Sequence, residues 1–234
     1  MPPQVEAGVL RPSRDQPRTL VLVRHGETDW NLSGRAQGHA DVPLNDTGRV
    51  QAKAVALVMA SFGPSRLWSS DLARARQTAD AIAAATGLTV ECDRRLREYD
   101  VGARSGLTLA ELAEQHPQEY ADWMAGRTTT VVAGEETTPE VRARVTPALL
   151  QCLKGLAAGE VGVVVMHGAC LKVGLLGVLG WPWELSRTIQ GIENAAYCVL
   201  TEDVERGLLR LTSYNEKAGS GRHGPDFVAD APVG

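Results

Sequence analysis

Two short β-prone segments, each followed by the dipeptide His-Gly, constrain the fold of this 234-residue chain more than any other feature. Residues 19–24 (TLVLVR) and 161–166 (VGVVVM) are rich in valine and leucine. A continuous run of this kind is typical of a strand that is buried on both faces of a parallel sheet. Because parallel strands need helical crossovers, the two segments predict an α/β fold around a mostly parallel sheet.

Helical periodicity between these strands supports the same architecture. Residues 46–61 follow Asn45, a suitable N-cap, and one face of this predicted helix collects Val50, Ala54, Leu57, Val58 and Ser61. We expect that face to pack in the core. Further helices are expected over 71–86, 108–126 (divided at Pro117), 139–157 and 169–179, and further strands over 66–69, 88–92, 195–200 and 208–214. This alternation predicts a three-layer α/β/α domain over residues 18–216.

The two ends of the chain have the composition of tails. Residues 1–17 contain no apolar core of a signal peptide, and residues 219–234 are rich in Gly and Pro, so we expect a disordered N-terminal tail (1–17) and a flexible C-terminal tail (217–234). The longest apolar stretch, 171–181, is far shorter than the ~20 residues of a membrane span. The four cysteines form no CxxC pair, which favours reduced thiols and a cytoplasmic protein.

The charge balance limits the classes of partner. A formal net charge of −4 argues against a surface built for the phosphates of nucleic acid. A small anionic ligand remains compatible with an acidic chain, because one local basic pocket is enough to bind it. We therefore expect no nucleic-acid partner and no membrane partner.

His25 and His167 are expected to meet at one edge of the sheet, because each directly follows a predicted central strand. Ligands of α/β sheets bind beyond the carboxyl ends of the strands. One histidine at a strand end is as often a packing residue as a functional one, but two in the same pattern favour a site. The glycine after each, Gly26 and Gly168, allows the close backbone approach that anion sites require.

Charged residues near this edge suit a phosphate ligand. Arg24 directly precedes His25, and Arg74 lies early in the helix that follows the second strand. A guanidinium donates two parallel hydrogen bonds to phosphate and stays charged. Arg76, in the same helix, is better explained as a solvated surface residue. Glu98 follows a strand in a predicted loop, where a carboxylate can act as a general acid.

Four segments, taken in order, resemble the histidine phosphatase superfamily, also called the phosphoglycerate mutase-like family. They are residues 22–31 (LVRHGETDWN), 69–79 (SSDLARARQTA), 96–98 (LRE) and 165–168 (VMHG). The tripeptide RHG alone is a weak match, whereas the four segments in this order are specific. The resemblance covers about residues 19–215.

The resemblance implies a catalytic group of His25, Glu98 and His167. His25 is the implied nucleophile that takes up the phosphoryl group, and Glu98 protonates the leaving oxygen and later helps to activate water. The implied phosphate-binding residues are Arg24, Asn31, Arg74 and Gly168, and the implied substrate-binding residues are Gln37 and Gly38. No metal and no cofactor is implied, because the arginines supply the positive charge.

Some positions depart from the common family pattern. The usual His-Gly-Gly is His167-Gly168-Ala169-Cys170 here, and Lys172 stands where an arginine is common. The frequent GGES element appears as GEET at 134–137, which leaves the substrate contacts of this loop open. The position of Cys170 near the pocket suggests that the protein is sensitive to oxidants.

The short segment 99–108 favours the phosphatase branch of the family. The mutases that resemble this chain carry a longer basic insertion after the acid, whereas 99–108 is similar to the G-x-x-x-G-L-T of phosphatase members. We therefore expect a metal-independent phosphomonoesterase that acts through a phosphohistidine. The alternatives are mutase-like phosphoryl transfer and a non-catalytic phosphate-binding module, although a binding module is expected to lack the histidine or the acid that this chain retains.

The expected substrate is a small phosphorylated metabolite. The chain is similar to actinobacterial family members of the glucosyl-3-phosphoglycerate phosphatase type. This similarity implies a sugar phosphate or a phosphorylated carboxylic acid, such as a glycosyl phosphoglycerate. A homodimer is a possible assembly.

Overall fold

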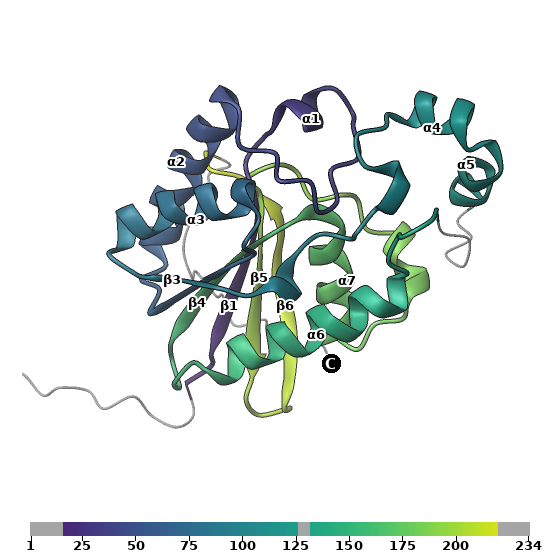
Figure 1. Ribbon diagram of the computed structural model, residues 1–234. Coiled ribbons are helices and arrows are strands. Elements are labelled where there is room, and N and C mark those ends of the chain that lie inside the picture. Colours follow the sequence, from purple (N-terminus) through teal and green to yellow (C-terminus); the bar gives the residue numbers. More distant parts are fainter. Residues whose placement is uncertain (1–15, 126–131, 220–234) are drawn as a thin grey trace, which may run out of the picture.

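The computed structural model describes residues 16–125 and 132–219. The predicted tails lie outside these residues except for 16–17 and 217–219. The strands are β1 (Thr19–Arg24), β2 (Arg66–Ser69), β3 (Val90–Cys92), β4 (Val161–Met166), β5 (Tyr197–Asp203) and β6 (Leu208–Glu216). They form one sheet in the order β3-β2-β4-β1-β5-β6 (Figure 1). The pairs β3–β2, β2–β4 and β4–β1 are parallel, whereas β5 runs antiparallel to both β1 and β6. The prediction of a mostly parallel sheet is therefore confirmed.

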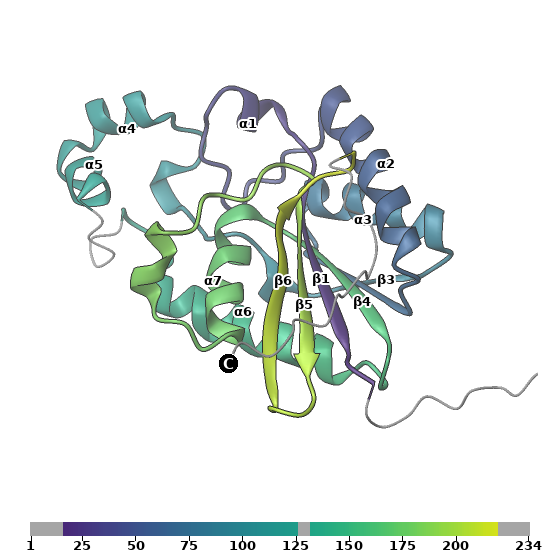
Figure 2. The ribbon, with the colours of Figure 1, turned by 180° about the vertical axis from the view of Figure 1, so that it is seen from behind.

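Four helices cover the two faces of this sheet. Figures 1 and 2 show α2 (Asp46–Ser61) and α3 (Ala73–Thr86) on one face, and α6 (Thr138–Lys154) and α7 (Gly168–Val178) on the other. The side chains of β1 alternate accordingly, because successive residues of a strand point to opposite faces. Val21 and Val23 pack with α2 and α3, whereas Leu20 and Leu22 pack with α6 and α7. The predicted three-layer architecture is confirmed.

The remaining helices lie toward the carboxyl ends of the parallel strands. They are α1 (Asp29–Leu32), α4 (Leu109–Gln115) and α5 (Pro117–Met124), at the top of the view in Figure 1. Pro117 starts α5, so the predicted division of this segment is confirmed. Short 3₁₀ turns cover Arg94–Leu96 (η1), Gly102–Arg104 (η2) and Trp183–Arg187 (η3). Within the described ranges every helix is too short or too polar to cross a bilayer.

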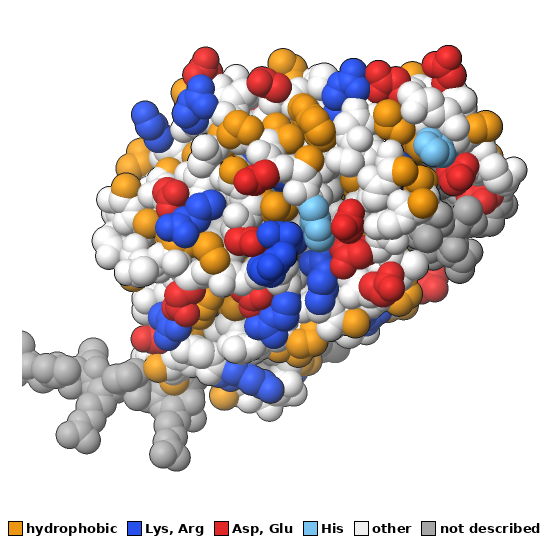
Figure 3. Space-filling model, in the orientation of Figure 1, with side chains coloured by type: hydrophobic (Ala, Val, Ile, Leu, Met, Phe, Trp, Pro, Cys, Tyr) orange, Lys and Arg blue, Asp and Glu red, His pale blue; other side chains and the backbone are white. Residues whose placement is uncertain are grey.

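The charged surface is mixed in sign. On the face in Figure 3, basic and acidic side chains lie beside one another instead of forming one extended patch of either sign. This distribution agrees with the small net charge of −4. It offers no broad basic surface on that face for a polyanion.

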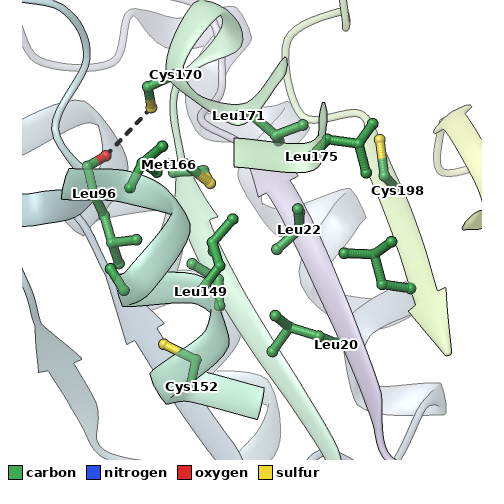
Figure 4. Packing of buried hydrophobic residues seen from close by; sticks show 14 of the residues in the cluster. Leu20, Leu22, Leu96, Leu149, Cys152, Met166, Cys170, Leu171, Leu175 and Cys198 are labelled. Atoms are coloured by element: carbon green, nitrogen blue, oxygen red, sulfur yellow. Dashed lines mark hydrogen bonds between the residues drawn. The ribbon is translucent and has the colours of Figure 1, made fainter. Parts of the chain in front are cut away.

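The core on the α6 and α7 side has the interleaved packing of a buried sheet face. Figure 4 shows Leu20 and Leu22 of β1 facing Leu149 of α6 and Leu175 of α7. All four are at most 2% exposed. This packing fixes α7 against the sheet, so the first turn of α7 is held at the edge where β1 and β4 end.

Helix α2 has its predicted bounds, but of its predicted buried face only Val58 is buried. Val50 is 68% exposed and Leu57 is 72% exposed. The buried positions are Gly48, Ala52, Val55, Ala56, Val58 and Met59. The reason is a close approach that the periodicity does not encode, since a Cβ at Gly48 would lie 2.0 Å from the carbonyl oxygen of Glu27. This approach turns the glycine side of α2 inward and the side with Val50 and Leu57 outward.

Candidate active site

His25 and His167 lie side by side at the carboxyl edge of the sheet. β1 and β4 pair in parallel with Arg24 opposite Met166, so the residue after each strand is a histidine. The ring centroids are 5.1 Å apart, and the ring planes meet at 61°. His25 is 3% exposed and His167 is fully buried. The predicted meeting of the two histidines is confirmed.

The hydrogen bonding of His25 leaves one ring nitrogen with a free lone pair. Its Nδ1 lies 2.6 Å from the carbonyl oxygen of Gly26. A carbonyl only accepts hydrogen bonds, so Nδ1 carries the proton and Nε2 does not. Burial, followed by the charges of Arg74 and Arg24, holds the pKa of His25 well below its ordinary value of 6.5. The ring is therefore neutral at neutral pH, with an unprotonated Nε2.

His167 is oriented by Ser70, the residue after β2. Its Nε2 lies 2.8 Å from the Ser70 hydroxyl oxygen. Burial, followed by the charge of Arg74, lowers the pKa of His167 well below 6.5. When the hydroxyl donates to Nε2, the neutral ring keeps its proton on Nδ1. Ser70 was not among the predicted site residues, although its place directly after a third strand of the same edge is a usable signal.

Arg24 and Arg74 are held in place by backbone carbonyls. Arg24 Nη1 donates to the carbonyl of Ile192 over 2.6 Å, and the two terminal nitrogens of Arg74 donate to the carbonyls of Ala40 and Gly38 over 2.8 Å. Burial lowers the pKa of both guanidiniums, that of Arg74 to about 10. Neither arginine forms an ion pair with a carboxylate of the described residues, so the buried charge of Arg74 and the half-buried charge of Arg24 flank the histidines.

Three buried nitrogens of these side chains lack a protein partner. Within residues 16–125 and 132–219, no acceptor lies within hydrogen-bond distance of Nε of Arg24, Nε of Arg74 or Nδ1 of His167. Buried polar groups are nearly always paired, so such a group requires an explanation. All three belong to side chains around His25. An anion with several acceptor oxygens, such as a phosphoryl group, matches this set of donors.

Glu98 reaches the same pocket from the loop after η1. Its carboxylate accepts hydrogen bonds from the backbone N–H groups of Tyr99, Ala169 and Cys170 over 2.9–3.0 Å. The last two belong to the first turn of α7, where free N–H groups favour a negative charge. The carboxylate therefore lies beside the end of β4 and lines the same pocket as His25.

The other predicted positions surround the same space. Asn31 Oδ1 accepts from the backbone N–H of Thr28, which leaves its amide NH₂ group available in the pocket. Gln37 is 9% exposed, and its Oε1 has no partner within the described ranges. A Cβ added at Gly168 would lie 3.2 Å from Arg24 Nε, so this glycine packs directly on the guanidinium. Gly38 supplies one of the two carbonyls that hold Arg74.

Most of the residues described above, but not His167 or Gly168, line a pocket of about 750 Å³ that extends well beyond His25. Its inner part contains Arg24, His25, Asn31, Gln37, Gly38, Arg74 and Glu98. Its outer part contains, among others, Arg35, Arg104, Glu135, Lys172 and Trp183. In the described part of the chain, His, Cys, Asp and Glu side chains form no group of three or more suited to a metal ion.

Arg144 is a further residue that the sequence analysis did not assign. From α6 it donates hydrogen bonds to the backbone carbonyls of Arg95, Arg97 and Glu98 over 2.7–2.9 Å. Its charge is balanced by Glu136, at 2.7 Å. A charge in the middle of a predicted helix carries no local signal of such a contact.

Comparison with known proteins agrees with this geometry. Residues 20–216 match the histidine phosphatase superfamily, branch 1. The chain is 42% identical over 156 residues to phosphoglycerate mutase-like protein 4 of Arabidopsis thaliana, covering 65% of this chain and 67% of that protein. It is 37% identical over 165 residues to the probable phosphoglycerate mutase GpmB of Salmonella paratyphi C, covering 69% and 76%. Among solved structures, mycobacterial glucosyl-3-phosphoglycerate phosphatase in complex with VO3 is 32% identical, with a TM-score of 0.78 over 86% of this chain and 100% of that one.

Proposed function

The chain belongs to branch 1 of the histidine phosphatase superfamily, and from this membership we propose that it hydrolyses phosphomonoesters through a phosphohistidine intermediate. One observation carries the proposal: three buried and unpartnered donors surround a histidine whose Nε2 is free. A phosphoryl group satisfies the donors and is the electrophile that such a nitrogen attacks.

In the first step, His25 Nε2 attacks phosphorus in line with the ester oxygen. The N–P bond forms while the P–O bond to the alcohol breaks, and Glu98 in its acid form gives its proton to the departing oxygen. Arg24, Arg74 and the Nδ1–H of His167 stabilise the negative charge on the equatorial oxygens. The Nδ1–H of His25 stays bonded to the Gly26 carbonyl, so the phosphorylated ring carries positive charge and is a good leaving group.

In the second step, water attacks the phosphohistidine from the side that the alcohol has left. Glu98, now a carboxylate, takes a proton from this water as the O–P bond forms and the N–P bond breaks. Inorganic phosphate is released, and both His25 and Glu98 return to their starting forms. In this cycle the two arginines provide the positive charge, and we propose that the reaction needs no metal ion.

We propose that water, and not a second alcohol, is the acceptor. The short segment 99–108 after Glu98 supports this choice, since it lacks the longer basic insertion that the family resemblance implies for the glycolytic cofactor-dependent mutases. Two of the relatives described above carry mutase names, so mutase-like transfer is the second candidate. A non-catalytic phosphate-binding module is a weaker third, because His25 and Glu98 are both present.

We propose a small phosphorylated metabolite as the substrate, either a sugar phosphate or a phosphorylated carboxylic acid such as a glycosyl phosphoglycerate. The size of the pocket supports a ligand larger than phosphate alone, and Gln37 and Gly38 are the proposed substrate contacts beside the phosphoryl group. The mycobacterial phosphatase of similar fold is named for a substrate of this chemistry. A cytoplasmic location and a possible homodimer stay predictions.

The decisive experiment measures phosphate release from a panel of monoesters, with and without a chelator, for the wild type and His25→Ala. We expect chelator-resistant release that His25→Ala abolishes, while circular dichroism shows a retained fold. Ordinary activity of folded His25→Ala would refute the phosphohistidine mechanism. Release that stops with chelator would refute metal independence. Phosphoryl transfer to an added alcohol without net release would favour the mutase, and no reaction at all would favour the binding module.

A further inference from the structure

The cations of the outer pocket differ in whether a carboxylate neutralises them. Arg35 is paired with Glu111 at 2.7 Å, and Arg104 forms an ion pair with Glu135. Lys172 has no such pair: in the part of the chain that the structure describes, its Nζ donates to the carbonyl of Ile189 over 2.6 Å and lies within ion-pair distance of no carboxylate. The pocket thus contains a positive charge that the protein leaves unbalanced.

Lys172 is also partly withdrawn from solvent. Its side chain is half-buried, and burial alone lowers the pKa of its ammonium group. Removing a charge from water without a counter-charge is unfavourable, so an unpaired ammonium in a pocket wall favours an anionic ligand. Arg187 is another pocket cation without a carboxylate partner in the described ranges, but it is exposed and therefore screened by solvent.

The position of Lys172 places this charge next to the proposed phosphate subsite. It lies four residues after Gly168 on α7, hence on the same helix face, and Gly168 packs on the guanidinium of Arg24. The ammonium of Lys172 donates to the carbonyl of Ile189, and the guanidinium of Arg24 donates to the carbonyl of Ile192. Three residues of chain span at most about 10 Å and each hydrogen bond is 2.6 Å long, so the two nitrogens are at most about 15 Å apart, and both side chains line the same pocket.

We infer that Lys172 forms a second anion subsite, which binds a carboxylate on the same substrate whose phosphoryl group lies between Arg24 and Arg74. The inference rests on the proposed function for the position of the phosphoryl group. A carboxylate pairs with the ammonium by a charge-assisted hydrogen bond, whereas the phosphate ester of an uncharged sugar has no second anionic group and leaves the ammonium unpaired. The subsite therefore selects phosphorylated carboxylic acids over phosphate esters that lack a carboxylate.

Binding to an inactive protein tests this subsite separately from turnover. In a His25→Ala background, calorimetry compares 3-phosphoglycerate with glycerol 3-phosphate, which has a hydroxymethyl group in place of the carboxylate. We expect the carboxylated ester to bind about 10- to 100-fold more tightly, the range of a hydrogen bond between charged groups. Lys172→Met should abolish this difference by weakening only the carboxylated ester, and Lys172→Arg should retain most of it.

Lys53→Met, which removes an exposed lysine of α2, is the control for the change in net charge. Equal affinity for the two esters would overturn the inference, as would binding of neither. If Lys172→Met weakened the binding of both esters equally, the inference would also be overturned, because Lys172 would then only support the loop at Ile189. Phosphate release by the wild type reports on the proposed function. Release without carboxylate preference in binding contradicts the subsite alone, and carboxylate-selective binding without release contradicts the phosphatase alone.

Discussion

The hydrogen bond from His25 to the Gly26 carbonyl determines which ring nitrogen can react. Without a fixed acceptor at Nδ1, a neutral imidazole divides its proton between two nitrogens, and part of the population has no lone pair toward the pocket. The 2.6 Å contact selects one tautomer. Burial keeps the ring unprotonated, because it lowers the pKa of His25 well below 6.5. The reactivity of this residue is therefore set by its surroundings.

Arg74→Ala should reduce kcat/KM by about 10² to 10³, because loss of a donor to the developing anion costs roughly 3–4 kcal/mol. Steady-state kinetics on the best monoester of the panel measures this effect. Arg76→Ala is the matched control, since Arg76 lies on the same helix but is exposed and paired with Asp80. A wild-type kcat/KM in folded Arg74→Ala would remove Arg74 from the proposed phosphate site.

The surroundings of Cys170 argue against the oxidant sensitivity that its position in the sequence suggests. Cys170 is fully buried, and burial raises its pKa well above 9, so it stays a thiol. Its Sγ lies 3.5 Å from the Leu96 carbonyl (Figure 4). Because the thiolate is the reactive form, we expect peroxide to inactivate the wild type and Cys170→Ser at the same rate. Faster inactivation of the wild type would restore the hypothesis.

At the scale of elements, α6 controls the loop that carries Glu98. Arg144 binds three carbonyls of this loop, and Glu136, just before α6, accepts from the backbone N–H of Asp100 over 2.8 Å. The Glu98 carboxylate then rests on the first turn of α7. The acid is thus fixed between two helices that pack on the same face of the sheet, and Arg144 acts as a positioning residue.

Arg144→Met should therefore lower kcat by up to about 10² with little change in KM, since a displaced acid loses much of the benefit of general acid catalysis. The loss should be much smaller with p-nitrophenyl phosphate, whose leaving group needs no proton. Arg142→Met, on the same helix, should behave like the wild type. An equal loss of kcat on both substrates would show that Arg144 supports the fold and does not position the acid.

At the scale of the whole molecule, the two buried histidines link stability to pH. The folded-state pKa values of His25 and His167 lie well below the ordinary value of 6.5, so the unfolded chain binds more protons below that pH. The contribution of these two histidines to the free energy of unfolding is then fully present above pH 6.5. It is lost as the pH falls from 6.5 toward the folded-state pKa values. Carboxylates with a lowered pKa, such as Asp71 and Glu202, also make the free energy of unfolding depend on pH, but in a more acidic range than the histidines.

We expect the free energy of unfolding, measured by urea denaturation, to fall between pH 7 and pH 5. Each histidine contributes at most about 1.4 kcal/mol per pH unit, the free energy of one proton per unit. The double variant His25→Gln/His167→Gln should show a shallower dependence over this range. An unchanged slope in that variant would mean that other groups cause the loss of stability.

Local sequence pattern determined the strands, most helix bounds and the meeting of His25 with His167. Those features depend on residues that are close in the chain, together with the general geometry of parallel sheets. Only the tertiary structure decided which face of α2 is buried, and it alone joined Ser70 to His167, 97 positions away, and Arg144 to the backbone of Glu98, 46 positions away. The physical reason is that such contacts depend on which side chains other elements bring within a few ångströms. A periodicity or a motif within one element places residues at a sheet edge or on a helix face, but it does not specify which side chains of other elements they contact there.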